Sequence, residues 1–240
     1  MSEAASGRFH VVVPDEGWFE EHIGCENACP VNTRAPRYIA AIAEGDFDTA
    51  FRLNREDNLF PAILGRICVH PCEEKCRRGL RMDRPISICS LKRASADYKT
   101  HLFLQSRPAT KRSRRVAVIG AGPSGLSVAN DLARMGYGVT IYEAFPVAGG
   151  MLNVGIPPYR LPREIVEEAI DEVRRLGVEI LIGTPVGREL NLEGLQKSYD
   201  AVYIAAGAHK AEKLGIPGEE LEGVLHGVTF MRMVNLKERI

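Results

Sequence analysis

The sequence predicts an α/β protein in which a cysteine-rich, α-helical part precedes a part built on a parallel sheet. Three observations predict this class. All six cysteines lie before residue 90, a strand, a glycine-rich turn, a helix and a second strand follow one another from residue 115, and helix and strand patterns then alternate. We expect a helical domain over residues 1–104, a linker over 105–115 and a sheet domain over 116–240.

Composition excludes several classes of protein. With 45% hydrophobic and 26% charged residues the chain has enough apolar surface for a normal globular core. A formal net charge of zero argues against nucleic acid or an anionic membrane as a partner. No apolar run approaches the ~18 residues of a membrane span, and no secretory signal is recognisable, so we expect a cytoplasmic protein. Cysteines in a reducing cytosol are more often metal ligands or buried thiols than disulfides.

A dinucleotide-binding pattern begins with the apolar, β-branched run over residues 116–119, which suits a buried parallel strand. The strand ends at a glycine triplet formed by Gly120, Gly122 and Gly125. Such a triplet permits a tight turn, close backbone approach to a pyrophosphate and close packing of the following helix. Taken alone, the triplet is weak evidence, because glycine-rich turns between a strand and a helix also occur for packing alone.

The residues after the triplet complete the pattern. Apolar residues recur at helical spacing over residues 124–135, Gly136 is a helix stop, and a second strand over 139–142 delivers Glu143. An acid at this place binds ribose hydroxyls. The whole series therefore favours a bound dinucleotide over a purely structural turn, without deciding which dinucleotide it is.

Further helices and strands follow in alternation. The Gly149-Gly150 pair would let the backbone lie against a flat ligand, although an ordinary loop is the alternative. An amphipathic helix is expected from Pro162 to residue 176, and strands are expected over residues 178–182 and 200–207. This order implies a parallel sheet.

The cysteines of the first 90 residues form the second informative pattern. Pro30 directly follows Cys29, as in the Cys-Pro ending of bacterial ferredoxin motifs. Pro71 suits the first turn of a helix, so Cys72 and Cys76, at i and i+4, are expected on one helix face. Cys89 heads a further helix, and helices over residues 36–43 and 47–53 supply a scaffold.

Three interpretations of these thiols compete. Structural zinc more often uses Cys-x-x-Cys pairs, which this sequence lacks. Inert core thiols would not require six cysteines in ninety residues, nor prolines beside two of them. An iron-sulfur cluster is the interpretation that the spacing favours.

Five ordered motifs resemble those of one enzyme family. They are the triplet from Gly120, Glu143 with the Gly149-Gly150 pair, and the runs over residues 155–162, 199–208 and 214–218. Together they resemble the small subunit of NADPH-dependent glutamate synthase, to which the N-terminal segment of dihydropyrimidine dehydrogenase is similar. The resemblance covers about residues 23–240. It implies a ferredoxin-like iron-sulfur domain followed by a Rossmann-like FAD-binding domain.

The resemblance also implies which residues hold FAD, rather than NAD, in the first βαβ unit. The triplet lies at the pyrophosphate, Glu143 at the adenosine ribose and Val186 at the adenine. The implied set is Gly120, Gly122, Pro123, Ser124, Gly125, Leu126, Glu143, Ala144, Gly149, Gly150, Met151, Arg160, Val186, Ala206 and Gly207.

The cysteine pattern departs from that of two-cluster relatives. Gly17 and Glu20 stand where those relatives have two further cysteines, so a cluster that uses Cys25 and Cys68 lacks two ligands. Cys25 and Cys68 are therefore spare, or they help to bind a second cluster. The resemblance implies another cluster on Cys29, Cys72, Cys76 and a non-cysteine ligand. Cys89 lies three residues from the position of that ligand, so we expect one [4Fe-4S] cluster on Cys29, Cys72, Cys76 and Cys89.

The family has a further, NAD(P)H-binding domain after the stretch matched here, so we expect this chain to be truncated before it. The resemblance implies an oxidoreductase module that passes electrons between NAD(P)H, FAD and the cluster to a larger catalytic or electron-accepting subunit. We expect no catalytic side chain. Two alternatives stay open: a plain NAD-dependent dehydrogenase domain, and a non-catalytic docking subunit stabilised by zinc.

Overall fold

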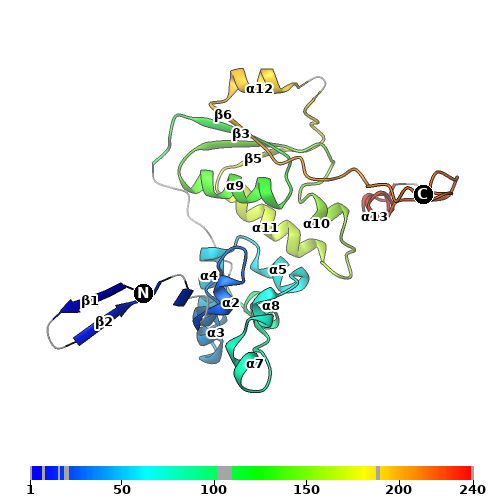
Figure 1. Cartoon of the computed structure of the whole chain (residues 1–240). Helices are drawn as coiled ribbons and strands as arrows, with labels where there is room; N and C mark the ends of the chain where they lie inside the picture. The colour runs from blue at the N-terminus through cyan, green and yellow to red at the C-terminus, as the bar shows by residue number, and fades with distance from the viewer. Residues whose placement is uncertain are drawn as a thin grey trace. The chain divides into compact units, whose positions relative to one another are not determined.

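The computed structural model describes residues 2–6, 9–15, 17–18, 22–101, 110–187 and 190–238. The chain divides into two compact units, Met1–Phe103 and Leu104–Ile240 (Figure 1). Residues 105–109 of the predicted linker lie outside the described residues. None of the helices in the described ranges has both the length and the apolar character that a bilayer crossing requires.

The first unit begins with an antiparallel hairpin and continues as a bundle of short helices. Strand β1 (Ser2–Ser6) pairs with β2 (Phe9–Val13). Helix α8 lies against α5, α4 and α3. Tyr38, Cys72 and Ile88 share one buried cluster, which fixes a cysteine in the core. The helices are α2 (Gly24–Asn27), α3 (Ala35–Ala43), α4 (Phe47–Asp57), α5 (Pro61–Ile67), α6 (Pro71–Glu74), α7 (Arg77–Arg81) and α8 (Ile88–Asp97).

One sequence prediction in this unit is wrong: Cys72 and Cys76 do not share a helix. Helix α6 ends at Glu74, and Cys76 has extended backbone (φ −66°, ψ 119°) at the start of α7. The break accompanies a tertiary contact, because a Cβ added to Gly24 of α2 would lie 2.9 Å from the Lys75 carbonyl oxygen. Spacing within the sequence does not reveal a contact between segments about fifty residues apart.

The second unit is a four-stranded, wholly parallel sheet in the order β5-β4-β3-β6. Its strands are β3 (Arg115–Ile119), β4 (Gly138–Tyr142), β5 (Glu179–Leu181) and β6 (Ala201–Ile204). In Figure 1, α9 (Pro123–Arg134) and α11 (Arg163–Arg175) lie on one side of this sheet and α12 (Leu192–Ser198) on the other. Helix α10 (Met151–Val154) contacts α13 (Gly227–Leu236). The predicted helix and strand order is confirmed.

The first βαβ connection depends on two glycines. Gly120 has a φ of +104°, and a Cβ there would overlap the Ala205 carbonyl oxygen of the neighbouring chain segment. A Cβ on Gly125 would overlap the Gly120 carbonyl oxygen, so Gly125 permits close packing of α9 on the turn. The strand expected over residues 200–207 is shorter, since β6 ends at Ile204, and it is an exposed edge strand.

Candidate functional site

A cleft of about 420 Å³ opens at the carboxyl ends of β3, β4 and β6. Ligands of open parallel sheets bind at this edge, where the strand order reverses. Residues from five segments line the cleft: Ile119, Gly120, Gly122, Pro123, Ser124, Tyr142, Glu143, Ala144, Phe145, Gly150, Met151, Val186, Ile204, Ala205, Ala206, Gly207 and His209.

Two facing glycines keep the wall of the cleft flat. A Cβ on Gly150, whose φ is +54°, would lie 2.8 Å from the Cα atom of Gly122. Gly122 is the residue before α9, and Pro123 occupies the first turn of that helix. The twelve-residue helix α9 therefore presents its unpaired N–H groups and the positive end of its dipole at the cleft, which suits a pyrophosphate.

Glu143 lies at the floor of the cleft and is 4% exposed. Its Oε2 accepts a hydrogen bond from the Ala121 N–H at 2.7 Å, and its Oε1 accepts one from the Phe145 N–H at 2.8 Å. The carboxylate thus fixes the turn after β3 to the end of β4. Each carboxylate oxygen has a second lone pair, which can accept a hydrogen bond from a ribose hydroxyl.

Not every residue of the predicted cofactor set lines this cleft. Gly125 and Leu126 pack beneath it, and Gly149 holds the turn through its N–H bond to the Ala121 carbonyl oxygen at 2.8 Å. Arg160 is exposed and is not among the lining residues. The members that line the cleft are Gly120, Gly122, Pro123, Ser124, Glu143, Ala144, Gly150, Met151, Val186, Ala206 and Gly207.

The sequence-based prediction missed three aromatic residues of the cleft, Tyr142, Phe145 and His209. Phe145 and His209 meet edge to face with ring centroids 5.0 Å apart. The His209 Nδ1 atom is buried and has no hydrogen-bond partner. An orphaned imidazole nitrogen on a residue that lines the cleft fits a polar ligand there. Phe145 lies two residues after Glu143, and His209 lies two residues after Gly207. This closeness in sequence to two predicted cofactor-binding residues could have pointed to both of these residues.

The first unit holds the thiols, and none of the six cysteines forms a disulfide bond. Cys72 and Cys76 are buried. The buried Tyr38 ring marks their common neighbourhood: burial raises the pKa of its phenol, and thiolate charge at Cys72 and Cys89 raises it further. Cys25 and Cys29 act on the same phenol, so four cysteines lie within electrostatic range of one ring.

Individual thiols also affect one another's pKa values. Burial raises the pKa of Cys25, and the Cys76 thiol adds to the rise, as expected from the contact between Gly24 and Lys75. Burial also raises the pKa of Cys72, to about 11, with a contribution from Cys68 and Cys29. The charge of Cys76 thus acts on the Cys25 thiol, and the charges of Cys68 and Cys29 act on the Cys72 thiol.

Two thiols have surroundings that favour the thiolate. Burial acts against ionisation of Cys76, but backbone N–H groups of Ile86, Gly79 and Arg78 outweigh it and lower the pKa of this thiol. The pKa of Cys29 is lowered too, because hydrogen bonding to Thr33 outweighs burial. N–H groups near sulfur are also a feature of iron-sulfur ligands.

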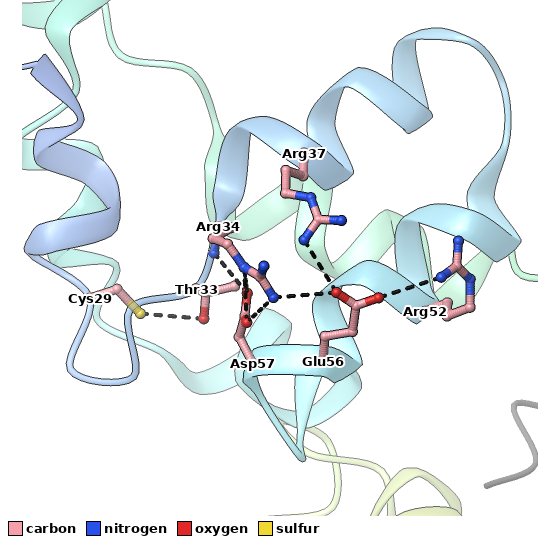
Figure 2. A network of polar contacts seen from close by, with 7 residues as sticks. All are labelled: Cys29, Thr33, Arg34, Arg37, Arg52, Glu56 and Asp57. Atoms are coloured by element: carbon pink, nitrogen blue, oxygen red, sulfur yellow. Dashed lines mark hydrogen bonds and ion pairs between the residues drawn. The ribbon is translucent and has the colours of Figure 1, made fainter. Parts of the chain in front are cut away.

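Figure 2 shows how Cys29 is held in place. Its Sγ lies 3.5 Å from the Thr33 Oγ1 atom. Arg34, which follows Thr33, donates hydrogen bonds to both carboxylate oxygens of Asp57 in α4, the shortest being 2.6 Å from Nη2 to Oδ1. Arg34 also forms an ion pair with Glu56 of the same helix. The segment that carries Cys29 is thus anchored to the end of a separate helix.

Cys89 has different surroundings. Its thiol donates to the Leu64 and Gly65 carbonyl oxygens, each at 3.6 Å, and its backbone N–H donates to Glu73 at 2.8 Å. Over the described residues, no three side chains of Cys, His, Asp or Glu stand close enough together to hold a metal ion. The soft thiol donors fit an iron-sulfur cluster, but the four cysteines predicted as ligands do not converge on a common point.

The fold and the cleft define a dinucleotide-binding α/β protein with a thiol-rich helical unit. Comparison with known proteins identifies the class. Residues 21–102 match the family model for dihydropyrimidine dehydrogenase domain II, 4Fe-4S cluster, and residues 114–239 match that for pyridine nucleotide-disulphide oxidoreductase. The chain belongs to the pyridine nucleotide-disulphide oxidoreductase family.

Three curated relatives illustrate the similarity. The β subunit of NADP(+)-dependent formate dehydrogenase from Moorella thermoacetica is 43% identical over 237 residues, with coverage of 88% of this chain and 33% of that protein. The β subunit of NADPH-Fe(3+) oxidoreductase from Geobacter sulfurreducens is 40% identical over 215 residues, with coverage of 87% and 32%. The small chain of glutamate synthase [NADPH] from Mycobacterium tuberculosis is 34% identical over 213 residues, with coverage of 88% and 43%.

These findings confirm the resemblance inferred from the sequence motifs. The chain spans about a third of the length of the first two relatives. A 4Fe-4S domain followed by a pyridine nucleotide-disulphide oxidoreductase domain implies a [4Fe-4S] cluster, FAD and NAD(P)H as cofactors. The glycine wall, the end of α9 and the orphaned His209 nitrogen fit a dinucleotide in the cleft.

Proposed function

We propose that this chain is the flavin and iron-sulfur electron-transfer module of an NAD(P)H-dependent oxidoreductase. The observation that supports it most is the presence of a glycine-walled cleft and a thiol-rich helical core on one polypeptide. When bound, FAD accepts a hydride from NAD(P)H and releases the two electrons singly to the cluster. The side chains of this chain bind and orient these groups, and we assign none of them a catalytic role.

In the proposed site each part of the cleft has a separate task. The N–H groups at the start of α9 bind the pyrophosphate, and Gly122 and Gly150 let it approach the backbone. Glu143 accepts a ribose hydroxyl while holding the turn after β3. Val186 and Gly207 both line the cleft. In the proposed site Val186 lies next to the adenine and Gly207 next to the pyrophosphate.

We further propose that the electrons pass to a larger partner subunit, as in enzymes that resemble glutamate synthase. The support is that the three relatives named above are themselves called β subunits or a small chain. Such a partner would be detected by purifying the tagged chain from its native host and identifying a stoichiometric companion. Recovery of the chain alone, with full NAD(P)H-dependent activity, would contradict a partner.

We propose Cys29, Cys72, Cys76 and Cys89 as the cluster ligands. This set requires the Cys89 thiol to leave the Leu64 and Gly65 carbonyl oxygens. Single serine variants of the chain, purified without oxygen, test it through their iron and sulfide contents. We expect Cys89→Ser to lose the cluster and Cys68→Ser, the matched control, to retain it; the reverse result would transfer the ligand role to Cys68.

Two rival functions make different predictions for the same preparation. A plain NAD-dependent dehydrogenase would show no flavin bands in the visible spectrum. A docking subunit with structural zinc would contain zinc without iron. We expect flavin, iron and sulfide together in protein purified without oxygen, and either rival result would overturn the proposal.

A further inference from the structure

A strongly basic, exposed segment of the first unit has no part in the cofactor binding proposed above. We call residues 75–85, which comprise α7 and its flanks, the α7 loop. In Figure 1 this loop forms one edge of the helical unit, and no residue of α7 is buried. Its charged residues are all exposed: one acid, Asp83, and five bases, Lys75, Arg77, Arg78, Arg81 and Arg84. Even with Glu74, which immediately precedes it, the segment has an excess of three positive charges in a chain whose formal net charge is zero.

Contacts within the α7 loop fix its shape. Arg78 donates two hydrogen bonds to the carboxylate of Asp83, at 3.0 and 3.2 Å. The Leu80 N–H donates to the Cys76 carbonyl oxygen at 3.0 Å. A Cβ added to Gly79 would lie 2.9 Å from the Pro85 nitrogen, so the backbone at the end of the loop lies against its middle. A surface that is already ordered loses less conformational entropy when it binds a partner.

The α7 loop differs from the rest of the unit in how its cations are paired. Three exposed arginines elsewhere in the unit have acidic partners in the chain, Arg37 and Arg52 with Glu56 at 3.2 and 3.4 Å, and Arg93 with Asp97 at 3.0 Å. Over the described residues, by contrast, Lys75, Arg77 and Arg84 have no carboxylate within ion-pair distance. These three charges are therefore available to the acids of another molecule.

Two apolar side chains lie among these charges. Leu80 is 67% exposed and Met82 is 79% exposed. Methionine and arginine are both enriched at protein–protein interfaces, where an apolar centre is surrounded by a polar rim. The phosphates of a nucleic acid offer no partner to exposed apolar side chains. The five residues of α7 are too few to form the amphipathic face that holds a helix in a membrane interface. The combination therefore fits an acidic protein surface best.

We propose that the α7 loop is the surface on which the electron-accepting partner subunit docks, through an acidic face of that subunit. This inference rests on the proposed function, which supplies the partner. Leu80 and Met82 form the apolar centre of the contact, and Lys75, Arg77 and Arg84 face carboxylates at its rim. Charges at the rim of an interface act mainly on the rate of association and on its salt dependence.

Photocrosslinking in the native host tests where the partner docks. Glu74→benzoylphenylalanine places a crosslinker beside the α7 loop and leaves its cations and apolar side chains intact. We expect a crosslink to the stoichiometric companion subunit, within a peptide of net negative charge. Glu44→benzoylphenylalanine, at another exposed acid of the same unit, is the matched control and should give no such product. Absence of a crosslink from Glu74, or a crosslink to a basic peptide, to nucleic acid or to lipid, would overturn the proposal.

Association kinetics with the crosslinked companion subunit test the charges. We expect the triple variant Lys75→Gln, Arg77→Gln, Arg84→Gln to associate at least about tenfold more slowly than the wild type at about 0.1 M salt. The difference should disappear near 1 M salt, where the Debye length falls from about 10 Å to about 3 Å. The triple variant Arg37→Gln, Arg52→Gln, Arg93→Gln removes the same charge from the same unit and should keep the wild-type rate.

The outcomes separate this inference from the proposed function. Equal slowing in both triple variants would show that only net charge matters, and would overturn the α7 loop as the docking surface. Wild-type rates in both triple variants would overturn it too. The flavin content of the same wild-type preparation tests the proposed function independently. A chain without flavin overturns that function, whereas a flavin-containing chain with either of the two kinetic results above overturns this inference alone.

Discussion

At the scale of single residues, the shape of the cleft depends on glycines, which have no side chain, as much as on the polar groups that line it. Gly122 has an ordinary φ of −78°, so alanine fits its backbone, and an added Cβ would approach nothing closer than the Gly150 Cα atom, 3.8 Å away. The methyl group would nevertheless occupy the wall against which we place the pyrophosphate. Gly122 is thus a position where folding and cofactor binding can be separated.

We expect Gly122→Ala to fold normally and to bind flavin at least about tenfold more weakly, a change of about 1.4 kcal/mol. Gly227→Ala is the matched control, since it lies at the start of α13 and an added Cβ there meets no atom within 4 Å. Flavin release on dilution and thermal unfolding would be measured for both. Equal flavin affinity in Gly122→Ala and the wild type would place the cofactor elsewhere.

Sequence reasoning reached the residues whose task is local. The spacing of Gly120 and Gly125 and the place of Glu143 follow from the geometry of a strand, a turn and a helix, and the sequence contains that geometry. The contact between Phe145 and His209 joins segments 64 residues apart, and no local pattern encodes it. The bond that Glu143 accepts from the Ala121 N–H joins residues 22 positions apart and was hidden for a similar reason.

At the scale of elements, α3 and α4 are joined by the ion pair that precedes α3. Arg34 binds Asp57, whose side chain is only 14% exposed. Burial alone would raise the pKa of Asp57, but the hydrogen bonds and charge of Arg34 outweigh it and lower the pKa below its usual 3.8. A carboxyl whose pKa is lower in the folded state stabilises the fold above its unfolded pKa, and this contribution is lost as pH falls through the folded pKa.

We therefore expect Asp57→Asn to lower the free energy of unfolding by about 1 to 3 kcal/mol at pH 7. The difference from the wild type should shrink as the pH falls below about 3.8. Urea unfolding followed by circular dichroism between pH 3 and pH 7 measures it. Glu44→Gln, an exposed site in the same unit, serves as the control. A difference that is independent of pH would show that the carboxylate charge does not matter.

Element prediction succeeded where periodicity controls the structure and failed where a tertiary contact does. The amphipathic pattern of α11 and the stop at Gly136 (φ +92°) were both readable. The interruption between Cys72 and Cys76 was not, because it accompanies packing of α2 on α6 rather than any helix-breaking residue between them. The burial of Lys92 was not readable either, because it depends on how α8 packs against the neighbouring helices.

At the scale of the whole molecule, we assign two redox cofactors to two compact units of one chain. Composition, cysteine placement and the order of motifs predicted this division, since each unit has its own chemistry. Spacing did not decide which of the six thiols are ligands, because it does not reveal that the charge of Cys76 acts on Cys25 while those of Cys68 and Cys29 act on Cys72.

The most direct test of the central claim is the number of electrons that the chain accepts. Protein purified without oxygen would be titrated with dithionite in an optical cell, with the flavin and iron-sulfur absorbance recorded separately. The account predicts about three electrons per chain, two to the flavin and one to the cluster. An uptake of about two electrons, with flavin bleaching alone, or no uptake at all, would contradict it.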